Sequence, residues 1–188
     1  MKEMILRKES VDAVGIRVRN ELIKIIALDG RTVDISAWVM ARMSKWRQLH
    51  DGDCEAGGFL TGYINGNTGN IIIDGMSEPY KLDYRTPTRF DMRDPRHKIF
   101  LHQGKKKKTS YLGVWHTHPE QIPIPSDRDM TDWRETVRKD KSGCNCFFFI
   151  IIGIDQMRIW LGRKGPSNES LITEVFEEEN EDGLYKNG

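Results

Sequence analysis

The stretch YLGVWHTHPEQIPIPSDRDMTDW, residues 111–133, decides the fold because a strand pattern, a loop and a helix start follow one another directly. Residues 111–118 have the apolar and aromatic side chains of a strand. Prolines at positions 119, 123 and 125 exclude a long helix until Ser126, so a helix is expected over residues 126–141. Side chains two positions apart in a strand share a face, so His116 and His118 are expected to project together beside Leu112 and Val114.

Two interpretations of this stretch remain open on its residues alone. In the first, Ser126 and Asp129 form a capping box at the helix start, and the two histidines are an ordinary pair in a strand. In the second, His116, His118 and Asp129 converge on one metal ion, because two histidines and a carboxylate are a ligand set of catalytic zinc sites. The histidine pair, the carboxylate and the neighbouring hydroxyl occur together, and this combination favours the metal site.

Outside this stretch, strands and helices are mixed without a regular alternation. A helix is expected over residues 36–50, where Val39, Met43, Trp46 and His50 have helical spacing behind a cap at Asp34 or Ser36. Strands are expected at residues 57–64 and 70–76, which an Asn- and Gly-rich turn joins into a hairpin, and at residues 144–154 and 156–163. This order predicts an α/β (α+β) domain around one sheet.

The pattern also divides the chain into three parts. Residues 1–35 are expected to be an N-terminal extension, as a strand pair or irregular. Residues 36–165 are expected to form the main domain, with an irregular insertion at about residues 78–110 that contains a short helix near residues 96–103. Residues 166–188 are expected to be a C-terminal segment with a short strand and an acidic tail.

Composition limits the class of protein and its partners. Lys and Arg number 29 and Asp and Glu 28, so a net charge of +1 predicts no general attraction to nucleic acid. No apolar run is long enough to cross a bilayer, and the N-terminus has no signal-peptide core, so no membrane association is expected. Three cysteines are too few for a disulfide framework, which fits a reducing cytoplasmic location.

The cysteines, the lysine run, the remaining histidines and the tryptophans are interpreted without a catalytic or metal-binding role. Cys54, Cys144 and Cys146 are expected to pack in the interior. The lysine run at residues 105–108 is expected to be a solvated surface. The remaining histidines, His50, His97 and His102, have no partner at metal-ligand spacing. The tryptophans are expected in the core, namely Trp38, Trp46, Trp133 and Trp160.

The residues His116-Thr117-His118-Pro119, followed by Ser126 and Asp129, resemble the motif of the JAMM (MPN+, JAB domain) zinc metalloproteases. That motif is an upstream glutamate followed by H-x-H-P-x6-S-x-x-D, and Glu55 in CEAGGFLTGYI is similar to the glutamate segment. The resemblance covers about residues 36–165 and looks most like the JAMM peptidases of bacterial anti-phage CBASS operons. It implies the JAMM/MPN fold, a mixed central sheet flanked by helices as in cytidine deaminases.

The resemblance also implies a function and a role for each site residue. His116, His118 and Asp129 would bind Zn²⁺, Glu55 would be general base and then general acid, and Ser126 would donate to the oxyanion. The enzyme would be an isopeptidase that cuts after the extended C-terminal tail of a conjugated protein, either a cGAS-like nucleotidyltransferase (CD-NTase) or a ubiquitin-like protein. An E1/E2-like ligase would belong to the same pathway. The alternatives are a non-catalytic MPN scaffold and a deubiquitinase-like enzyme for another bacterial modifier.

Overall fold

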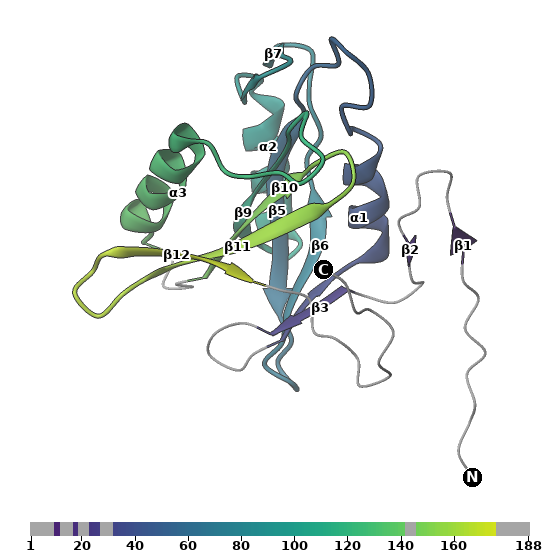
Figure 1. Ribbon diagram of the computed structural model, residues 1–188. Coiled ribbons are helices and arrows are strands. Elements are labelled where there is room, and N and C mark those ends of the chain that lie inside the picture. The colour runs from purple at the N-terminus through teal and green to yellow at the C-terminus, as the bar shows by residue number, and fades with distance from the viewer. Residues whose placement is uncertain (1–9, 12–16, 19–22, 27–31, 142–145, 176–188) are drawn as a thin grey trace, which may run out of the picture.

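The computed structural model describes residues 10–11, 17–18, 23–26, 32–141 and 146–175. Near the N-terminus, β1 (Ser10–Val11) pairs with β2 (Arg17–Val18), and β3 (Ile23–Ile26) pairs with β4 (Thr32–Ile35). The other elements in chain order (Figure 1) are α1 (Ala37–Ser44), β5 (Gly57–Ile64), β6 (Ile71–Met76), β7 (Tyr84–Thr86), β8 (Arg89–Asp91), α2 (Arg96–Lys106), β9 (Ser110–Thr117), α3 (Asp127–Lys139), β10 (Phe147–Ile152), β11 (Met157–Lys164) and β12 (Ser170–Val175).

One large sheet forms the centre of the domain. Its strand order is β12-β11-β10-β9-β5-β6-β4-β3. The pairs β9–β10 and β4–β6 are parallel and the other neighbours are antiparallel, so the sheet is mixed. The expected single α+β domain with a mixed central sheet is therefore confirmed. Strands β3 and β4 belong to this sheet, although the sequence assigns residues 1–35 to an extension.

Helices cover both faces of the sheet. In Figure 1, α1 and α3 lie on opposite sides of the strands, and α2 lies behind β5 and β9. Phe59 of β5 contacts both His97 of α2 and Tyr111 of β9, and Tyr111 in turn contacts Phe147 of β10. Phe147 packs in the cluster under α3, so α2 and α3 share one face.

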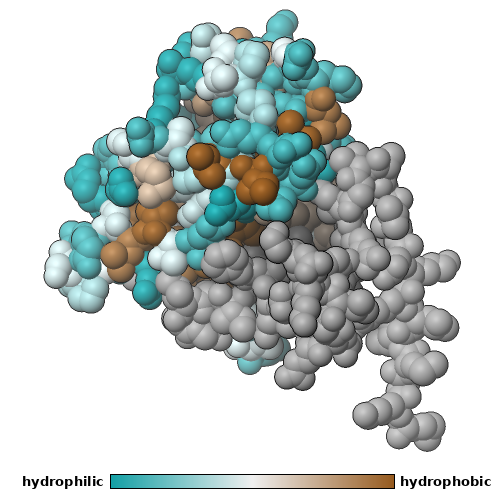
Figure 2. All heavy atoms as spheres, viewed as in Figure 1, coloured by the Kyte–Doolittle hydropathy of each residue, from teal (hydrophilic) through white to brown (hydrophobic). Residues whose placement is uncertain are grey.

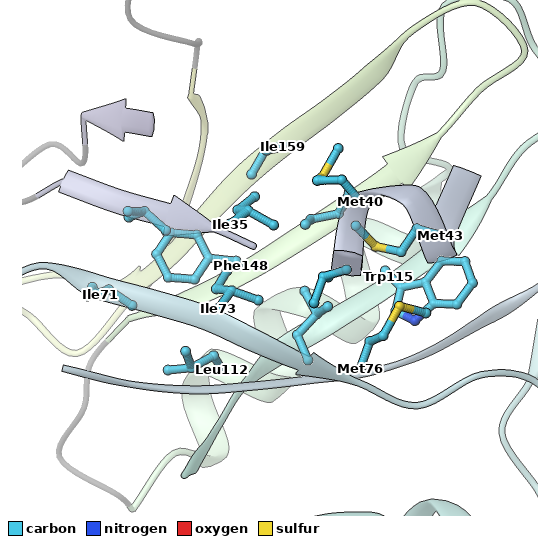
Figure 3. Packing of buried hydrophobic residues seen from close by; sticks show 14 of the residues in the cluster. Ile35, Met40, Met43, Ile71, Ile73, Met76, Leu112, Trp115, Phe148 and Ile159 are labelled. Atoms are coloured by element: carbon cyan, nitrogen blue, oxygen red, sulfur yellow. The ribbon is translucent and has the colours of Figure 1, made fainter. Parts of the chain in front are cut away.

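The core consists of two apolar layers, one on each face. Alternate residues of β10 enter each layer, so Phe148 and Ile150 pack toward α1 and Phe149 and Ile151 toward α3. A continuous apolar run is the expected pattern for a strand buried on both faces. Figure 3 shows the first layer, in which Met40 and Met43 of α1 pack over the strands.

The core predictions for tryptophan and cysteine are largely confirmed. Trp133 and Trp160 are buried, and Trp46 packs partly buried against the first layer. Trp38 is the exception, because it is 52% exposed and the core assignment is wrong for it. Cys146 is buried, Cys54 is half-buried, and Cys144 lies outside the described residues.

Several predicted boundaries differ from the structure. The predicted helix over 36–50 ends at Ser44, and its N-cap residue Ser36 makes no side-chain cap bond, while Asp34 lies within β4. The short helix expected near residues 96–103 extends to Lys106 as α2, and the rest of the expected irregular insertion contains the β7–β8 hairpin. The hairpin β5–β6 and the strands β10, β11 and β12 lie where the sequence predicts them.

A bulge in β9 changes which residues share a face with the histidines. Leu60 of β5 pairs with Gly113 of β9, and the next residue, Thr61, pairs with Tyr111. Leu112 therefore has no paired residue in β5. Gly113 beside it has φ +142°, a conformation that favours glycine. Leu112 consequently packs toward α1 while Val114 packs toward α3, and the prediction that both lie beside the histidines is wrong for Leu112.

The surface of the described residues is mainly hydrophilic on the face drawn in Figure 2, with small separate hydrophobic groups between. None of the helices in the described ranges is long and apolar enough to cross a membrane.

Candidate metal centre

His116 lies near the C-terminal end of β9, and His118 directly follows this strand, both on the α3 face of the sheet. Their Nε2 atoms are 3.0 Å apart, so the two rings project together as their spacing predicts. Both residues are buried, with exposed fractions of 9% and 8%. The ring of His116 also makes an edge contact with Trp133 of α3, which places the helix directly beside the pair. Strand alternation and helix packing therefore orient both imidazoles toward α3.

Asp129 reaches the histidines from the first turn of α3. Its Oδ1 lies 3.3 Å from the Nε2 of His116, and its Oδ2 lies 3.5 Å from the Nε2 of His118. Ser126 donates to Oδ2 from its backbone N–H at 2.8 Å and from its hydroxyl at 2.6 Å, and the Asp129 N–H donates to the Ser126 Oγ. The capping box is therefore real, but its side-chain bonds use Oδ2 while Oδ1 faces His116. Capping and metal binding are compatible.

The separations of these donor atoms fit a single ion. A tetrahedral metal with ligand bonds of about 2.0–2.1 Å holds its ligand atoms about 3.3 Å apart. Here the two Nε2 atoms are 3.0 Å apart, one carboxylate oxygen of Asp129 (Oδ1) lies 3.3 Å from the Nε2 of His116, and the other (Oδ2) lies 3.5 Å from the Nε2 of His118. Within the described ranges, His116, His118 and Asp129 are the one group of three or more His, Cys, Asp or Glu residues whose ligand atoms lie within 4.8 Å of one another. These residues form a candidate metal site.

The charge of Asp129 also suits a metal ligand. Burial raises the pKa of this carboxyl, but hydrogen bonds from His116 and His118 outweigh burial and hold the pKa well below its usual value. Burial lowers the pKa of His118, and the hydrogen bond and charge of Asp129 raise it by more. The site therefore contains an ionised carboxylate that stabilises positive charge, which is what binding of a cation requires.

Glu55 lies just before β5, and β7 holds its backbone. Its N–H donates to the carbonyl of Thr86 at 2.8 Å, and the Nε of Arg85 donates to its carbonyl at 2.7 Å. Burial raises the pKa of the Glu55 carboxyl to about 7; the charge of His118 opposes this shift and the charge of Asp129 adds to it. A carboxyl with such a pKa can both accept and release a proton near neutrality.

The glycines after Glu55 are required by packing inside the protein. The sequence suggests that Gly57 and Gly58 let the backbone lie close to a substrate chain. In the structure, a Cβ at Gly57 would lie 2.6 Å from the ring of Phe90, and one at Gly58 would lie 2.1 Å from the carbonyl oxygen of Ser77. The space beside both glycines is therefore filled by the chain itself, which corrects that interpretation.

The buried side chain of His97 connects two parts of the insertion at residues 78–110 to Ser77, the residue that follows β6. His97 of α2 lies 2.9 Å from the Ser77 Oγ through Nδ1 and 2.9 Å from the Asp83 Oδ2 through Nε2. The sequence assigns no partner to His97, and its true partner Asp83 is 14 residues away in an irregular segment. No periodic pattern reveals such a pair, so sequence reasoning missed it.

Asp91 connects the same insertion to α3. Its carboxylate accepts hydrogen bonds from Arg89 and Arg93 of the insertion and from Arg128 at the start of α3, the last at 2.8 Å. Arg128 is the neighbour of Asp129, so β8 and the first turn of α3, which carries this candidate ligand, are linked directly. The insertion thus contacts both the Glu55 segment and the Asp129 segment.

Comparison with known proteins shows which family the chain resembles. Residues 37–162 match the family described as prokaryotic homologues of the JAB domain. A protein of Vibrio cholerae serotype O1 named "CD-NTase/cGAS isopeptidase" is 33% identical over 144 residues, covering 75% of this chain and 85% of the relative. A protein of Escherichia coli with the same name is 32% identical over 148 residues, covering 77% and 89% of the two chains. The matched ranges include both halves of the candidate site.

Proposed function

The chain belongs to the prokaryotic homologues of the JAB domain, and from this membership we propose that it is a zinc-dependent isopeptidase acting on a CD-NTase conjugate. The observation that carries the proposal is the convergence of His116, His118 and Asp129, with contacts of 3.0 to 3.5 Å, near the buried carboxyl of Glu55, whose pKa the charges of His118 and Asp129 affect. Two histidines and one carboxylate leave a fourth position of a tetrahedral ion open, as catalytic zinc sites do.

The proposed chemistry is hydrolysis of an amide. A bound zinc ion supplies Lewis-acid chemistry, because it lowers the pKa of water to about 7 and polarises a carbonyl. Glu55 takes a proton from the attacking water and later delivers it to the departing amine, so that an acid and a free amine are released. Its raised pKa of about 7 supports both duties, since the proton can be held and released near neutrality. The hydrogen bonds that the Glu55 backbone makes with Thr86 and Arg85 fix the position from which its carboxyl extends.

Ser126 is proposed to donate a hydrogen bond to the oxygen that becomes negatively charged on the substrate. Removal of one such donor in other enzymes costs about 3 to 4 kcal/mol in the barrier. In the structure the Ser126 hydroxyl donates to Asp129. The proposed role therefore requires the hydroxyl to turn from the carboxylate toward the substrate.

The proposed substrate follows from the names of the relatives. They are called CD-NTase/cGAS isopeptidase, so the expected substrate is a CD-NTase whose C-terminal tail is joined to an amine. An extended tail can bind by strand addition beside the site, with residues 78–110 as one wall of the channel. An E1/E2-like ligase that forms the conjugate is the expected pathway partner, and the proposed location is cytoplasmic. A ubiquitin-like modifier is the second candidate substrate.

A non-catalytic scaffold is the competing function, and one experiment separates the two. Purified protein is loaded with zinc, its metal content is measured, and it is incubated with a C-terminally extended CD-NTase and with a ubiquitin-like fusion. The proposal expects one zinc per chain and cleavage that Glu55→Gln abolishes while zinc content stays unchanged. A scaffold would cleave neither substrate, and a protein without stoichiometric metal would contradict the proposed mechanism.

A further inference from the structure

Two uncharged side chains, Gln48 and Thr117, connect the Glu55 segment to the histidine pair. Both are buried, with exposed fractions of 3% and 0%. Thr117 stands between His116 and His118 in the chain, and strand alternation directs its side chain to the other face of the sheet. Gln48 comes from the segment between α1 and β5, 69 residues before Thr117 in sequence. Such a buried polar pair is costly unless its hydrogen bonds are satisfied.

Thr117 forms the last link between β5 and β9. Its N–H donates to the Ala56 carbonyl at 2.9 Å, and its Oγ1 accepts the Ala56 N–H at 2.9 Å. This contact follows the Gly57–His116 pair of the antiparallel register, so a hydroxyl accepts where a strand carbonyl would normally accept. Ala56 is the neighbour of Glu55. The hydroxyl of Thr117 therefore fixes the Glu55 backbone relative to the two histidines.

Gln48 sets the direction of these bonds. Its Nε2 donates to the Asp53 carbonyl at 2.9 Å and to the Pro87 carbonyl at 2.7 Å. Because carbonyls can only accept, the NH₂ group must face them, and Oε1 must face Thr117 at 3.1 Å. The Thr117 hydroxyl then gives its one proton to Gln48, and a lone pair remains for the Ala56 N–H.

We propose that Gln48, acting through Thr117, is a positioning residue that sets the placement of Glu55 relative to His116 and His118. The proposal rests on the proposed isopeptidase function. Gln48 also donates hydrogen bonds to the carbonyls of Asp53 and Pro87. Asp53 lies two residues before Glu55, and Pro87 directly follows Arg85 and Thr86, which bind the Glu55 backbone. Gln48 touches neither the candidate metal ligands nor the reacting atoms by any of these bonds, so it acts through the backbone that carries Glu55.

The test compares three variants of the zinc-loaded full chain. Thr117→Val keeps the shape of the side chain without its hydroxyl, Thr117→Ser keeps the hydroxyl, and Gln48→Met keeps the length without the amide. For Thr117→Val and Gln48→Met we expect one bound zinc, kcat lowered about 10- to 100-fold and KM within about twofold of the unaltered enzyme. Thr117→Ser is expected to restore kcat to within about threefold.

A second measurement needs no substrate. Amide hydrogen exchange at Ala56 is expected to be slow in the unaltered protein and in Thr117→Ser, and at least about tenfold faster in Thr117→Val. The proposal is overturned by unchanged kcat in both Thr117→Val and Gln48→Met, or by loss of zinc and fold together in Thr117→Val and Thr117→Ser alike. If the unaltered protein cleaves no conjugate, the proposed function fails, while Ala56 exchange still decides whether these bonds fix the Glu55 segment.

Discussion

Gly58→Ala tests how tightly β5 and β6 approach beside the site. An added Cβ would lie 2.1 Å from the Ser77 carbonyl oxygen and 2.7 Å from its hydroxyl. A normal contact between carbon and oxygen in a sheet is about 3.3 Å, so the strands must separate by about 1 Å. Ser77 also exchanges hydrogen bonds with Phe59 at 2.9 Å, and its carbonyl accepts a hydrogen bond from the Trp115 Nε1–H. The separation weakens these bonds.

The expected loss of stability is about 3 kcal/mol, from about 2 kcal/mol of overpacking and about 1 kcal/mol of hydrogen bonding. In a domain of this size such a loss lowers the melting temperature by about 6 to 12 °C. The matched control is Gly66→Ala, because nothing lies within 4 Å of a Cβ at that position. It is expected to change stability by less than about 1 kcal/mol, in the stabilising direction. Both variants are followed by thermal and urea unfolding, and equal melting temperatures would refute the packing argument.

Three further predictions concern the site. Zinc at 100 times its Kd is expected to stabilise the protein by about 2.7 kcal/mol in thermal unfolding; His118→Gln should remove this shift, and an undiminished shift would exclude His118 as a ligand. Ser126→Ala removes the hydroxyl and is expected to lose about 1 kcal/mol of capping and about 100-fold or more in cleavage rate. A folded, zinc-loaded Ser126→Ala that cleaves at the unaltered rate would contradict the oxyanion role. Burial raises the pKa of the Glu55 carboxyl from 4.5 to about 7, so the folded zinc-free protein binds the carboxyl proton more tightly than the unfolded chain does. The free energy of unfolding therefore decreases as the pH rises from 4.5 to about 7. Glu55→Gln should therefore stabilise the zinc-free protein by about 1 to 3 kcal/mol at pH 8 and by much less at pH 5, as urea unfolding can measure; the same gain at both pH values would show that the charge is not the cause.

The parts of the site that the sequence predicts depend on local geometry. His116 and His118 share a face because a strand alternates, and Asp129 returns to the strand end because Ser126 begins a helix there. The hairpin β5–β6 and the buried run of β10 likewise follow from short-range patterns. These features need no knowledge of distant contacts, so single-sequence reasoning reaches them.

The features that the sequence does not predict depend on contacts between distant segments. The bulge at Leu112 arises where β9 must pair with β5 on one side and with β10 on the other. The reason for Gly57 lies in Phe90 of the insertion, and the partner of His97 is Asp83. Trp38 is a tryptophan, a residue type expected in the core, yet it is 52% exposed. The residue types and hydrophobic periodicity of one segment do not determine which other helix or strand packs against it.

The insertion holds the backbone of Glu55 and is also the proposed wall of the substrate channel, and this affects how the proposed role in substrate binding can be tested. Residues 78–110 are the proposed wall of the substrate channel, but Thr86 and Arg85 also hold the backbone of Glu55. Deletion of the insertion would therefore remove the proton-handling geometry together with the wall, and loss of cleavage would not distinguish them. Leu82 is 63% exposed on the same insertion and takes no part in that clamp by its side chain. Because Leu82→Ser leaves the clamp in place, a selective loss of cleavage of a folded conjugate, with a short peptide still cut, would assign the wall to substrate binding alone.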